Sequence, residues 1–335
     1  MKSVLLGHGS GGKLTHELIG DLILKKLQNP ILQRLEDSAI FSFNGIRLAF
    51  TTDSYVVKPI FFPGGDIGKL AVCGTINDLA VSGAVPRYIS CGLILEEGFS
   101  MENLEKILDS MAKVAAEAGV EVVTGDTKVV ERGKADGIFI NTSGVGFIPE
   151  GIRLGMEEIR AGDLILINGP IGDHGIAVLS RREGIQFEAE IVSDCAPLNG
   201  LIARLISEVG DGIRFMRDPT RGGLATTLKE IAEGTGLGVE ADETAIPINE
   251  AVRAACEILG LDPMFVANEG KVVLVIEPES APKALQIMRR HPLGAGSAII
   301  GEITADHPGQ VHLKTEIGSK RMIDMLVGEQ LPRIC

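Results

Sequence analysis

The chain has 335 residues, with 45 acidic side chains against 32 basic ones and a net charge of −13 at pH 7. This balance argues against nucleic acids and anionic membranes as partners, because both bind to positive surfaces. Hydrophobic residues make up 45% of the sequence, enough for the cores of two domains, and no apolar run approaches the roughly 20 residues of a membrane helix.

The N-terminal half begins with a glycine cluster, GHGSGGK, at residues 7–13. Apolar residues at helical spacing follow over residues 14–23 and predict a helix. Residues 46–51 form an apolar run, which predicts a strand that ends at Asp53. The apolar stretch before the glycine cluster is too short for a signal peptide.

Two longer helices are predicted next. Asp66 is a plausible N-cap for a helix over residues 67–80. Ser100 caps a second helix, with apolar residues at helical spacing, that stops at Gly119.

Strands then alternate with turns and helices to the end of the chain. A strand at 120–124 precedes Gly125 and Asp126, a long strand covers 138–148, and the polar segment 149–161 joins two domains. Further strands are predicted at 164–168, 213–216, 271–276 and 298–303, with helices after the GDHG and RDPTRGG turns. This alternation predicts an α/β protein.

The chain closes with GEQLPRIC, so that Cys335 is its last residue. Pro332 has a fixed φ and no N–H, and it cannot easily continue a helix or enter the middle of a sheet. We therefore expect a mobile arm over residues 328–335 with an exposed, nucleophilic sulfur at its tip. A prenylation signal does not fit, because its cysteine stands fourth from the end.

The other four cysteines lie in apolar segments and are expected in the core; they are Cys73, Cys91, Cys195 and Cys256. The chain shows no CxxC and no mixed Cys/His metal spacing. An odd number of dispersed cysteines is typical of a reduced, cytoplasmic protein.

The glycine cluster is a candidate anion site, since backbone N–H groups at a helix start can bind phosphate. Its spacing matches neither a P-loop nor a dinucleotide fingerprint, and a flexible N-terminal loop is an equal alternative. The residues concerned are Gly9, Gly11, Gly12 and Lys13.

Five aspartates stand at predicted strand ends or in turns: Asp37, Asp53, Asp78, Asp126 and Asp218. In α/β sheets ligands gather beyond the carboxyl ends of strands, and several carboxylates there would repel each other without a cation. Any single aspartate is more simply a turn or cap residue. Asp53, Asp78 and Asp126 together favour Mg²⁺, which prefers hard oxygen ligands.

Three further residues are candidates for a chemical role. Glu269 stands in ANEG just before an apolar strand, where it is a candidate general base and equally an ordinary turn residue. Lys128, two residues after Asp126, could neutralise phosphate charge. His174 in GDHG is equally a residue of a helix start.

Eight motifs occur in one order along the chain: HGSGGK, FFPGGDIGKLAVCGTINDLAVSGAVP, EEG, TGDTKVV, GDHGIAVLSRREG, RDPTRGGLA, LGLDPMFVANEGK and the terminal PRIC. With these motifs essentially the whole chain resembles the hydrogenase maturation factors of the HypE family. GTINDLA, TGDTK and RDPTRGG are also similar to motifs of a wider ATP-using superfamily, that of aminoimidazole ribonucleotide synthetase and selenophosphate synthetase.

The resemblance implies an α/β (α+β type) fold with two domains. Residues 1–152 would form an N-terminal ATP-binding and dimerisation domain, whose sheet pairs with its copy in a homodimer across a barrel-like interface. Residues 153–327 would form a C-terminal α/β sandwich, and residues 328–335 a flexible tail that bears the acceptor cysteine.

The resemblance also implies a reaction. A partner carbamoyltransferase, HypF, would load a carbamoyl group onto Cys335, and ATP with Mg²⁺ would phosphorylate its oxygen. Loss of the nitrogen protons and of phosphate would leave a thiocyanate. The cyano group would pass to iron on a HypC–HypD complex and become a ligand of the [NiFe] hydrogenase centre.

The roles that the resemblance assigns fall into three sets. The catalytic residues would be Cys335, Glu269 as the base, and Lys128. The nucleotide ligands would be Gly9, Gly11, Gly12, Lys13, Asp37, Asn77, Asp126 and Arg221. The Mg²⁺ ligands would be Asp53, Asp78, Asp126 and Asp218.

Two other functions remain open. A selenophosphate synthetase would be expected to carry a cysteine or selenocysteine in the glycine cluster, where this chain has Ser10. A carrier without catalysis would only present Cys335 to partners, and the full set of ATP-type motifs argues against it.

Overall fold

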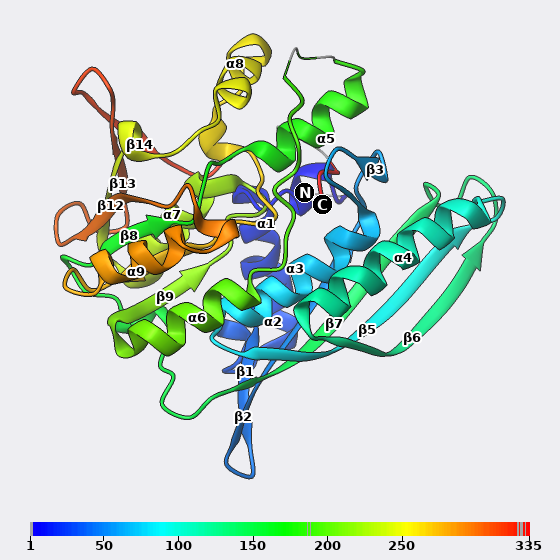
Figure 1. The fold of residues 1–335 in the computed structure, drawn as a ribbon, viewed down its shortest axis with the longest axis horizontal. Helices are drawn as coiled ribbons and strands as arrows, with labels where there is room; N and C mark the ends of the chain where they lie inside the picture. Colours follow the sequence, from blue (N-terminus) through cyan, green and yellow to red (C-terminus); the bar gives the residue numbers. More distant parts are fainter. Residues whose placement is uncertain (1–2, 186, 188, 327, 329–330, 332) are drawn as a thin grey trace.

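A computed structural model describes residues 3–185, 187, 189–326, 328, 331 and 333–335 of the chain. Two open sheets, each with its own helices, form the two halves of the molecule (Figure 1). The N-terminal sheet has the strand order β1-β2-β7-β5-β6. Its strands are β1 (Ala39–Phe43), β2 (Ile46–Tyr55), β5 (Val85–Glu96), β6 (Glu121–Val130) and β7 (Ile138–Ile148).

Two helices pack on this sheet, and each begins at its predicted N-cap residue. The Asp66 carboxylate accepts hydrogen bonds from Gly68 N at 2.7 Å and Lys69 N at 3.1 Å, and so begins α3 (Ile67–Val81). Ser100 accepts from Asn103 N and begins α4 (Met101–Ala118). The short strands β3 (Phe61–Phe62) and β4 (Gly65–Asp66) pair just before α3.

The C-terminal sheet has seven strands in the order β14-β13-β10-β12-β8-β11-β9. Its strands are β8 (Leu164–Ile167), β9 (Ile213–Arg217), β10 (Gly238–Asp242), β11 (Val273–Ile276), β12 (Ala298–Thr304), β13 (Val311–Lys314) and β14 (Lys320–Ile323). The main helices of this half are α5 (Asp173–Glu183), α6 (Asn199–Val209), α7 (Gly223–Thr235), α8 (Glu250–Leu259) and α9 (Ala281–Arg289). One apolar core lies between the sheet and α7, and a second between the sheet and α6 with α9. The two-domain α/β fold is thus confirmed.

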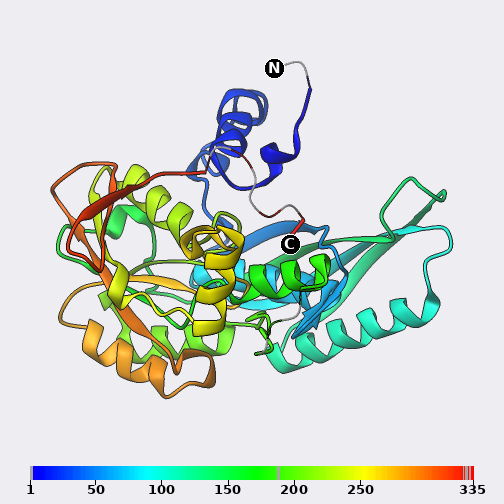
Figure 2. The ribbon, with the colours of Figure 1, turned by 90° about the horizontal axis from the view of Figure 1, so that it is seen from above.

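The N-terminal helical segment comprises α1 (Lys13–Leu18), a π-helical turn at Ile19–Ile23 and α2 (Leu24–Leu27). This segment projects from the rest of the molecule, and the C-terminus lies between the segment and the two sheets (Figure 2). The predicted helix forms, but its apolar face finds little cover, since Leu22 is 53% exposed.

Two strand ends were predicted wrongly. Strand β2 runs through Asp53 to Tyr55, and β6 runs through Asp126 to Val130. Neighbouring strands supply ladder partners beyond the predicted ends, because Asp53 pairs with Thr142 and Asp126 with Gly92. Both aspartates therefore lie within strands rather than in turns.

The expectation of an exposed terminal sulfur is also wrong. Cys335 is only 8% exposed, and Ile334 enters the core of the N-terminal half. The tail pairs with the segment after β2: Val56 N donates to Cys335 O at 3.3 Å, and Lys58 N donates to Arg333 O at 3.1 Å. These bonds give the carbonyl groups of Arg333 and Cys335 hydrogen-bond donors, although the tail is not a strand of either sheet.

The predicted mobility of the arm falls partly on residues 329, 330 and 332, among them Pro332, which lie outside the described residues.

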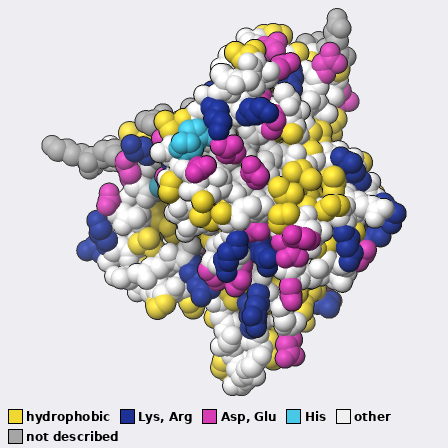
Figure 3. All heavy atoms as spheres, turned by 90° about the vertical axis from the view of Figure 1, so that its left-hand side faces the viewer, with side chains coloured by type: hydrophobic (Ala, Val, Ile, Leu, Met, Phe, Trp, Pro, Cys, Tyr) yellow, Lys and Arg dark blue, Asp and Glu magenta, His cyan; other side chains and the backbone are white. Residues whose placement is uncertain are grey.

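The surface gives two general results. On the face shown in Figure 3, acidic and basic side chains are interspersed, and no single-sign patch dominates that face. Among the described residues, no helix combines the length and apolar character needed to span a bilayer.

Candidate active site

The terminal cysteine borders a cavity of about 230 Å³ between the two halves of the molecule. Side chains from β2, α3, the turn after β9 and the turn before β11 meet there. Its lining residues are Asp37, Thr51, Thr52, Asp53, Ser54, Tyr55, Gly74, Asp78, Asp218, Thr220, Arg221, Glu269 and Cys335. The cavity therefore gathers most of the acidic residues singled out in the sequence, although they are far apart along the chain.

The aspartates of this cavity repel each other. Burial raises the pKa of Asp78 well above its usual range, and the charges of Asp53, Asp218 and Asp37 raise it further. Burial likewise raises the pKa of Asp218 well above its usual range. Like charges in one site disfavour ionisation, and the five carboxylates that line the cavity outnumber its one arginine, Arg221, which leaves a deficit of positive charge.

This deficit fits a divalent cation. The donors are hard carboxylate oxygens, the ligands that Mg²⁺ prefers. No three acidic, histidine or cysteine side chains among the described residues are already gathered as a metal site. Asp37 is in part neutralised, because Arg217 Nε lies 2.9 Å from its Oδ1. Asp53, Asp78 and Asp218 are the residues that would hold the ion.

Glu269 is a buried carboxylate without a partner for one oxygen. It is 3% exposed, and its Oε1 makes no hydrogen bond. Its backbone is fixed, because Glu269 N and Gly270 N donate to the Asp194 carboxylate at 3.1 and 3.2 Å and Lys271 Nζ lies 2.9 Å from Asp194. Burial raises the pKa of Glu269 well above its usual range. An unpaired buried acceptor is costly, so this oxygen is suited to a ligand.

Cys335 faces the same cavity as a thiol rather than a thiolate. Burial raises its pKa to about 12, and the charges of Glu269, Asp53 and Asp218 add to the shift, while Arg221 opposes it. A sulfur that carries an uncharged group suits this position better than a thiolate.

The glycine cluster contacts the root of the tail. Lys13 N donates to Leu326 O at 3.0 Å, and a Cβ at Gly12 would lie 2.5 Å from that same oxygen. Arg221 Nη1 donates to Gly9 O at 3.0 Å. Glycine at position 12 is therefore required by a close backbone approach. Part of the cluster borders a second cavity of about 330 Å³, which Cys335 also lines.

Two other predicted nucleotide ligands have different surroundings. Asn77 does not line the cavity: its Nδ2 donates to Ala196 O at 3.1 Å, and its Oδ1 accepts from Leu198 N at 2.8 Å. Its side chain joins the two halves of the protein. Gly11 has a φ of +76° and lies against Arg221.

Asp126 and Lys128 lie away from the cavity, on strand β6. They form an exposed ion pair at 2.7 Å, with 70% and 68% of their side chains accessible. The side-chain hydrogen bond from Lys128 lowers the pKa of Asp126. The prediction that Asp126 lies together with Asp53 and Asp78 is therefore not met within one chain.

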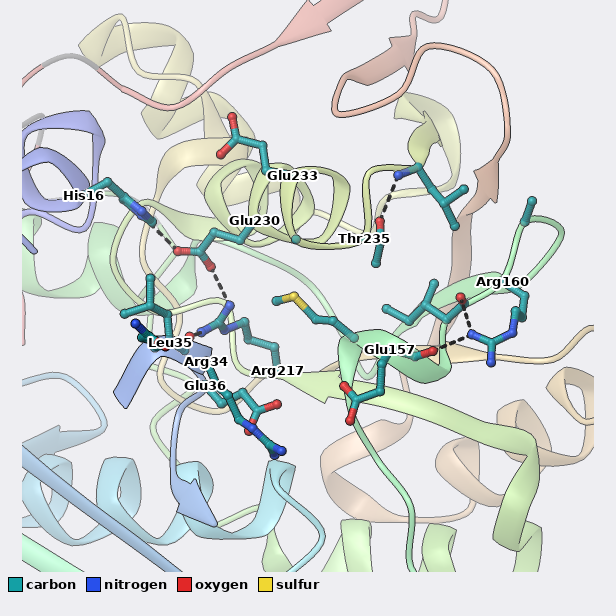
Figure 4. A pocket seen from close by; sticks show the side chains of 16 residues that line it. His16, Arg34, Leu35, Glu36, Glu157, Arg160, Arg217, Glu230, Glu233 and Thr235 are labelled. Atoms are coloured by element: carbon teal, nitrogen blue, oxygen red, sulfur yellow. Dashed lines mark hydrogen bonds and ion pairs between the residues drawn. The ribbon is translucent and has the colours of Figure 1, made fainter. Parts of the chain in front are cut away.

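A larger cavity of about 900 Å³ lies beside the N-terminal segment (Figure 4). Arg217 connects it to the acidic cavity, because its guanidinium contacts Glu230 at 3.0 Å as well as Asp37. Glu230 in turn contacts His16 at 3.1 Å. The sequence analysis missed Arg217, although it is the first residue of the RDPTRGG motif.

Comparison with known proteins places this geometry in a family. The model for "AIR synthase related protein, N-terminal domain" matches residues 35–148, and that for its C-terminal domain matches residues 160–314. The chain is 53% identical over 330 residues to the carbamoyl dehydratase HypE of Rhizobium leguminosarum bv. viciae, covering 98% of this chain and 94% of the relative. It is 48% identical to carbamoyl dehydratase HypE of Escherichia coli (strain K12), with both chains covered in full.

Solved structures agree with these relatives. A HypE in complex with ATP matches with a TM-score of 0.84 and 51% identity, covering 99% of this chain and 100% of that chain. A HypE–HypF complex matches with a TM-score of 0.88 and 48% identity, covering 92% of this chain and 99% of that one. With matches over its full length and with both domains of the family present, the chain belongs to the HypE family of AIR synthase related proteins.

Proposed function

We propose that the chain uses ATP to convert an S-carbamoyl group on its own Cys335 into a thiocyanate. As a member of the HypE family over its full length, it is a carbamoyl dehydratase of hydrogenase maturation. The observation that carries the finer proposal is the position of Cys335: it lines one cavity with the unpartnered Glu269 and the carboxylates suited to a cation.

The reaction balances without a redox step. The carbamoyl oxygen attacks the γ-phosphorus of ATP, ADP leaves, and the oxygen later departs as part of phosphate. The two nitrogen protons are removed, and the C–N bond becomes triple. The products are the S-cyano group, ADP, phosphate and the two protons, so that the protein loses the elements of water.

Glu269 is suited to take a nitrogen proton. Its Oε1 has no partner and borders the cavity that Cys335 lines. Burial raises its pKa most, and the charges of Asp218 and Asp53 raise it further. A cation held by these aspartates would bring the pKa back toward the working pH and leave a strong, ionised base.

The bound Mg²⁺ would supply electrostatic stabilisation of the phosphate groups during transfer. Asp53, Asp78 and Asp218 would hold it. Arg221 adds a positive charge at the mouth of the cavity, where it contacts the glycine cluster through Gly9.

A homodimer would bring Asp126 and Lys128 to this site. Strand β6 is an edge strand of its sheet, and nine of its ten residues are exposed. Its apolar residues include Val123, 56% exposed, and Val129, 66% exposed. An exposed apolar edge of this kind is typically covered by another chain. We infer that a second copy covers it in a barrel-like interface and that Lys128 then neutralises phosphate charge.

Carbamoyl loading requires the tail to leave the cavity. The inward thiol has a pKa of about 12, and a thiolate is the nucleophile in such a transfer. We propose that HypF loads the outward tail, and that a HypC–HypD complex accepts the cyano group from it. A relative with 48% identity forms a HypE–HypF complex, which supports the first partner.

Intact-mass measurement tests the proposal. Wild-type protein incubated with carbamoyl phosphate, HypF and ATP should gain one carbamoyl group and then lose the mass of water. Cys335→Ala should fold and bind ATP but gain nothing. Carbamoyl gain by this variant would show that another cysteine is the acceptor. Carbamoyl gain by the wild type without ATP-dependent loss of water would identify a carrier without catalysis.

A further inference from the structure

The imidazole of His174 is a buried group that the reaction above does not use. His174 stands in the first turn of α5 and is 0% exposed. Its Nε2 lies 2.9 Å from Ile334 O, and its Nδ1 lies 2.8 Å from Ser193 Oγ. The ring also meets Phe62 edge-on at a centroid distance of 5.3 Å. The side chain thus connects a fixed loop to the penultimate residue of the tail.

These contacts define the proton positions on the ring. A carbonyl oxygen only accepts, so Nε2 must carry the hydrogen that it donates to Ile334 O. In the neutral ring Nδ1 then accepts from the Ser193 hydroxyl, whose oxygen itself accepts from Cys195 N at 3.1 Å. Burial lowers the pKa of His174, which keeps the ring neutral. The Ser193 hydroxyl thus orients the ring so that Nε2 donates to the tail.

Backbone bonds from Val56 N to Cys335 O and from Lys58 N to Arg333 O, with the core packing of Ile334, also hold the tail. The side-chain contacts of Arg333 lie nearer the surface. Arg333 Nε donates to Val56 O at 3.0 Å, and its guanidinium pairs with Asp136, whose side chain is 41% exposed. Exposed ion pairs contribute little and are screened by salt. The bond from His174 is buried, lies one residue from Cys335, and would leave an unpaired buried donor if the tail shifted.

We propose that His174 is a positioning residue that, together with the backbone bonds from Val56 and Lys58, fixes the register of the docked tail and so sets where the Cys335 sulfur lies relative to Glu269. The docking role stands on the contacts above, whereas its consequence for dehydration rests on the function proposed in the preceding section. A tail held one residue out of register would move the sulfur away from the base, and small displacements of reacting groups slow reactions strongly.

The first experiment measures docking alone. The rate of iodoacetamide labelling at Cys335 is followed by peptide mass spectrometry in wild type, His174→Phe and His174→Gln. Phenylalanine keeps a ring against Phe62 but removes the donor, and we expect labelling about three- to tenfold faster, the ratio that one neutral hydrogen bond contributes. Glutamine keeps a donor near the Nε2 position and should stay near the wild-type rate.

Controls make this result specific. His312→Phe changes a half-buried histidine on β13 that makes no hydrogen bond with the described residues of the tail, and it should leave Cys335 labelling unchanged. If His174→Phe fails to fold, Ser193→Ala replaces it. This variant removes the hydroxyl that donates to Nδ1 and orients the ring, and it should also label faster at Cys335. Equal labelling rates in wild type and in the folded His174 or Ser193 variant would overturn the proposal.

The second experiment measures the consequence. Protein already carbamoylated by HypF is mixed with Mg-ATP, and loss of water is followed in a single turnover. We expect His174→Phe to be roughly 10- to 100-fold slower, while its loading by HypF proceeds at the wild-type rate or faster. Slower dehydration together with slower loading would indicate general damage instead of positioning. Faster labelling with no dehydration even in wild type would leave the docking intact and refute the proposed function.

Discussion

The acidic cavity and strand β6 carry side chains of the same type in opposite environments. In the cavity, burial and neighbouring charges raise the pKa of Asp78 and Asp218. On β6, Lys128 lowers the pKa of Asp126, and both side chains face solvent. One region thus has more carboxylates than cations, while the other holds a lysine on an exposed strand. The difference is the basis of our proposal that a second copy completes the site.

The two sheets show the same difference at a larger scale. The C-terminal sheet has an apolar core on each face. The N-terminal sheet carries α3 and α4, while the strands β5 and β6 extend away from the C-terminal half (Figure 1). A second copy on this sheet would bury its apolar strand and supply Lys128 to the cavity. The predictions below test that comparison, from the largest expected effect to the smallest.

Glu269→Gln should have the largest effect, because it removes the base and keeps its size. Dehydration of carbamoylated protein should fall about 10²–10⁴-fold, the usual contribution of a positioned general base. ATP affinity should stay near that of the wild type, since the residue is not proposed to bind ATP. Single-turnover mass spectrometry measures the dehydration rate, and calorimetric titration measures the ATP affinity.

Glu302→Gln is the matched control, because Glu302 lies at an exposed position of β12. It should not change either measurement. Wild-type dehydration by Glu269→Gln would remove Glu269 from the mechanism.

Asp78→Asn should separate binding from stability. Loss of one charged ligand should weaken Mg-ATP binding by roughly 10- to 100-fold, as charge-assisted contacts do. The protein without ligands should become more stable, because a buried carboxylate that Asp53 and Asp218 repel is neutralised. Thermal melting and titration at two Mg²⁺ concentrations measure both effects. A variant that is less stable yet binds ATP normally would identify Asp78 as a structural residue.

Mixing two inactive variants tests the second copy. Asp126→Asn and Glu269→Gln should each be nearly inactive, with Asp126→Asn melting like the wild type because its side chain is exposed. If Asp126 and Lys128 act across the dimer, subunit exchange creates sites with both groups intact, and activity should return to about a quarter of the wild-type value. Absence of any recovery in confirmed mixed dimers would show that the two residues act within one chain or not at all.

Much of the fold follows from local sequence signals. Asp66 and Ser100 begin helices as their capping chemistry predicts, and the strand at 138–148 is found as expected. These elements have short-range causes: a side-chain acceptor before a helix, or a glycine after it. The ends of β2 and β6 have long-range causes, because partner strands decide how far a ladder continues, and they were therefore missed.

The site shows the same division. The residue pattern and the motif resemblance both singled out Glu269, Asp78 and Cys335 as candidates, but neither could show that they line one cavity. Next to the buried Cys335, Ile334 O accepts a hydrogen bond from His174, a residue 160 positions away. No local pattern in GEQLPRIC encodes that contact, so the tail was expected to be exposed.

The smallest predicted effect is a dependence of stability on pH, and its sign follows from the raised pKa of Asp78. An acid whose pKa is raised in the folded state stabilises the protein below the ordinary carboxyl pKa of about 3.9 and loses that contribution as pH rises toward the folded pKa. Other carboxylates, such as Asp136, have lowered pKa values and act in the opposite direction. The pH dependence must therefore be compared between wild type and Asp78→Asn, because both proteins contain those other carboxylates. The melting temperature of the variant should exceed that of the wild type by about 2–4 °C more at pH 7 than at pH 4. Added Mg²⁺ should narrow this gap at pH 7, because the ion binds the ionised cavity of the wild type more tightly. A difference that is the same at both pH values would show that Asp78 is ionised throughout, already balanced by charges within the single chain.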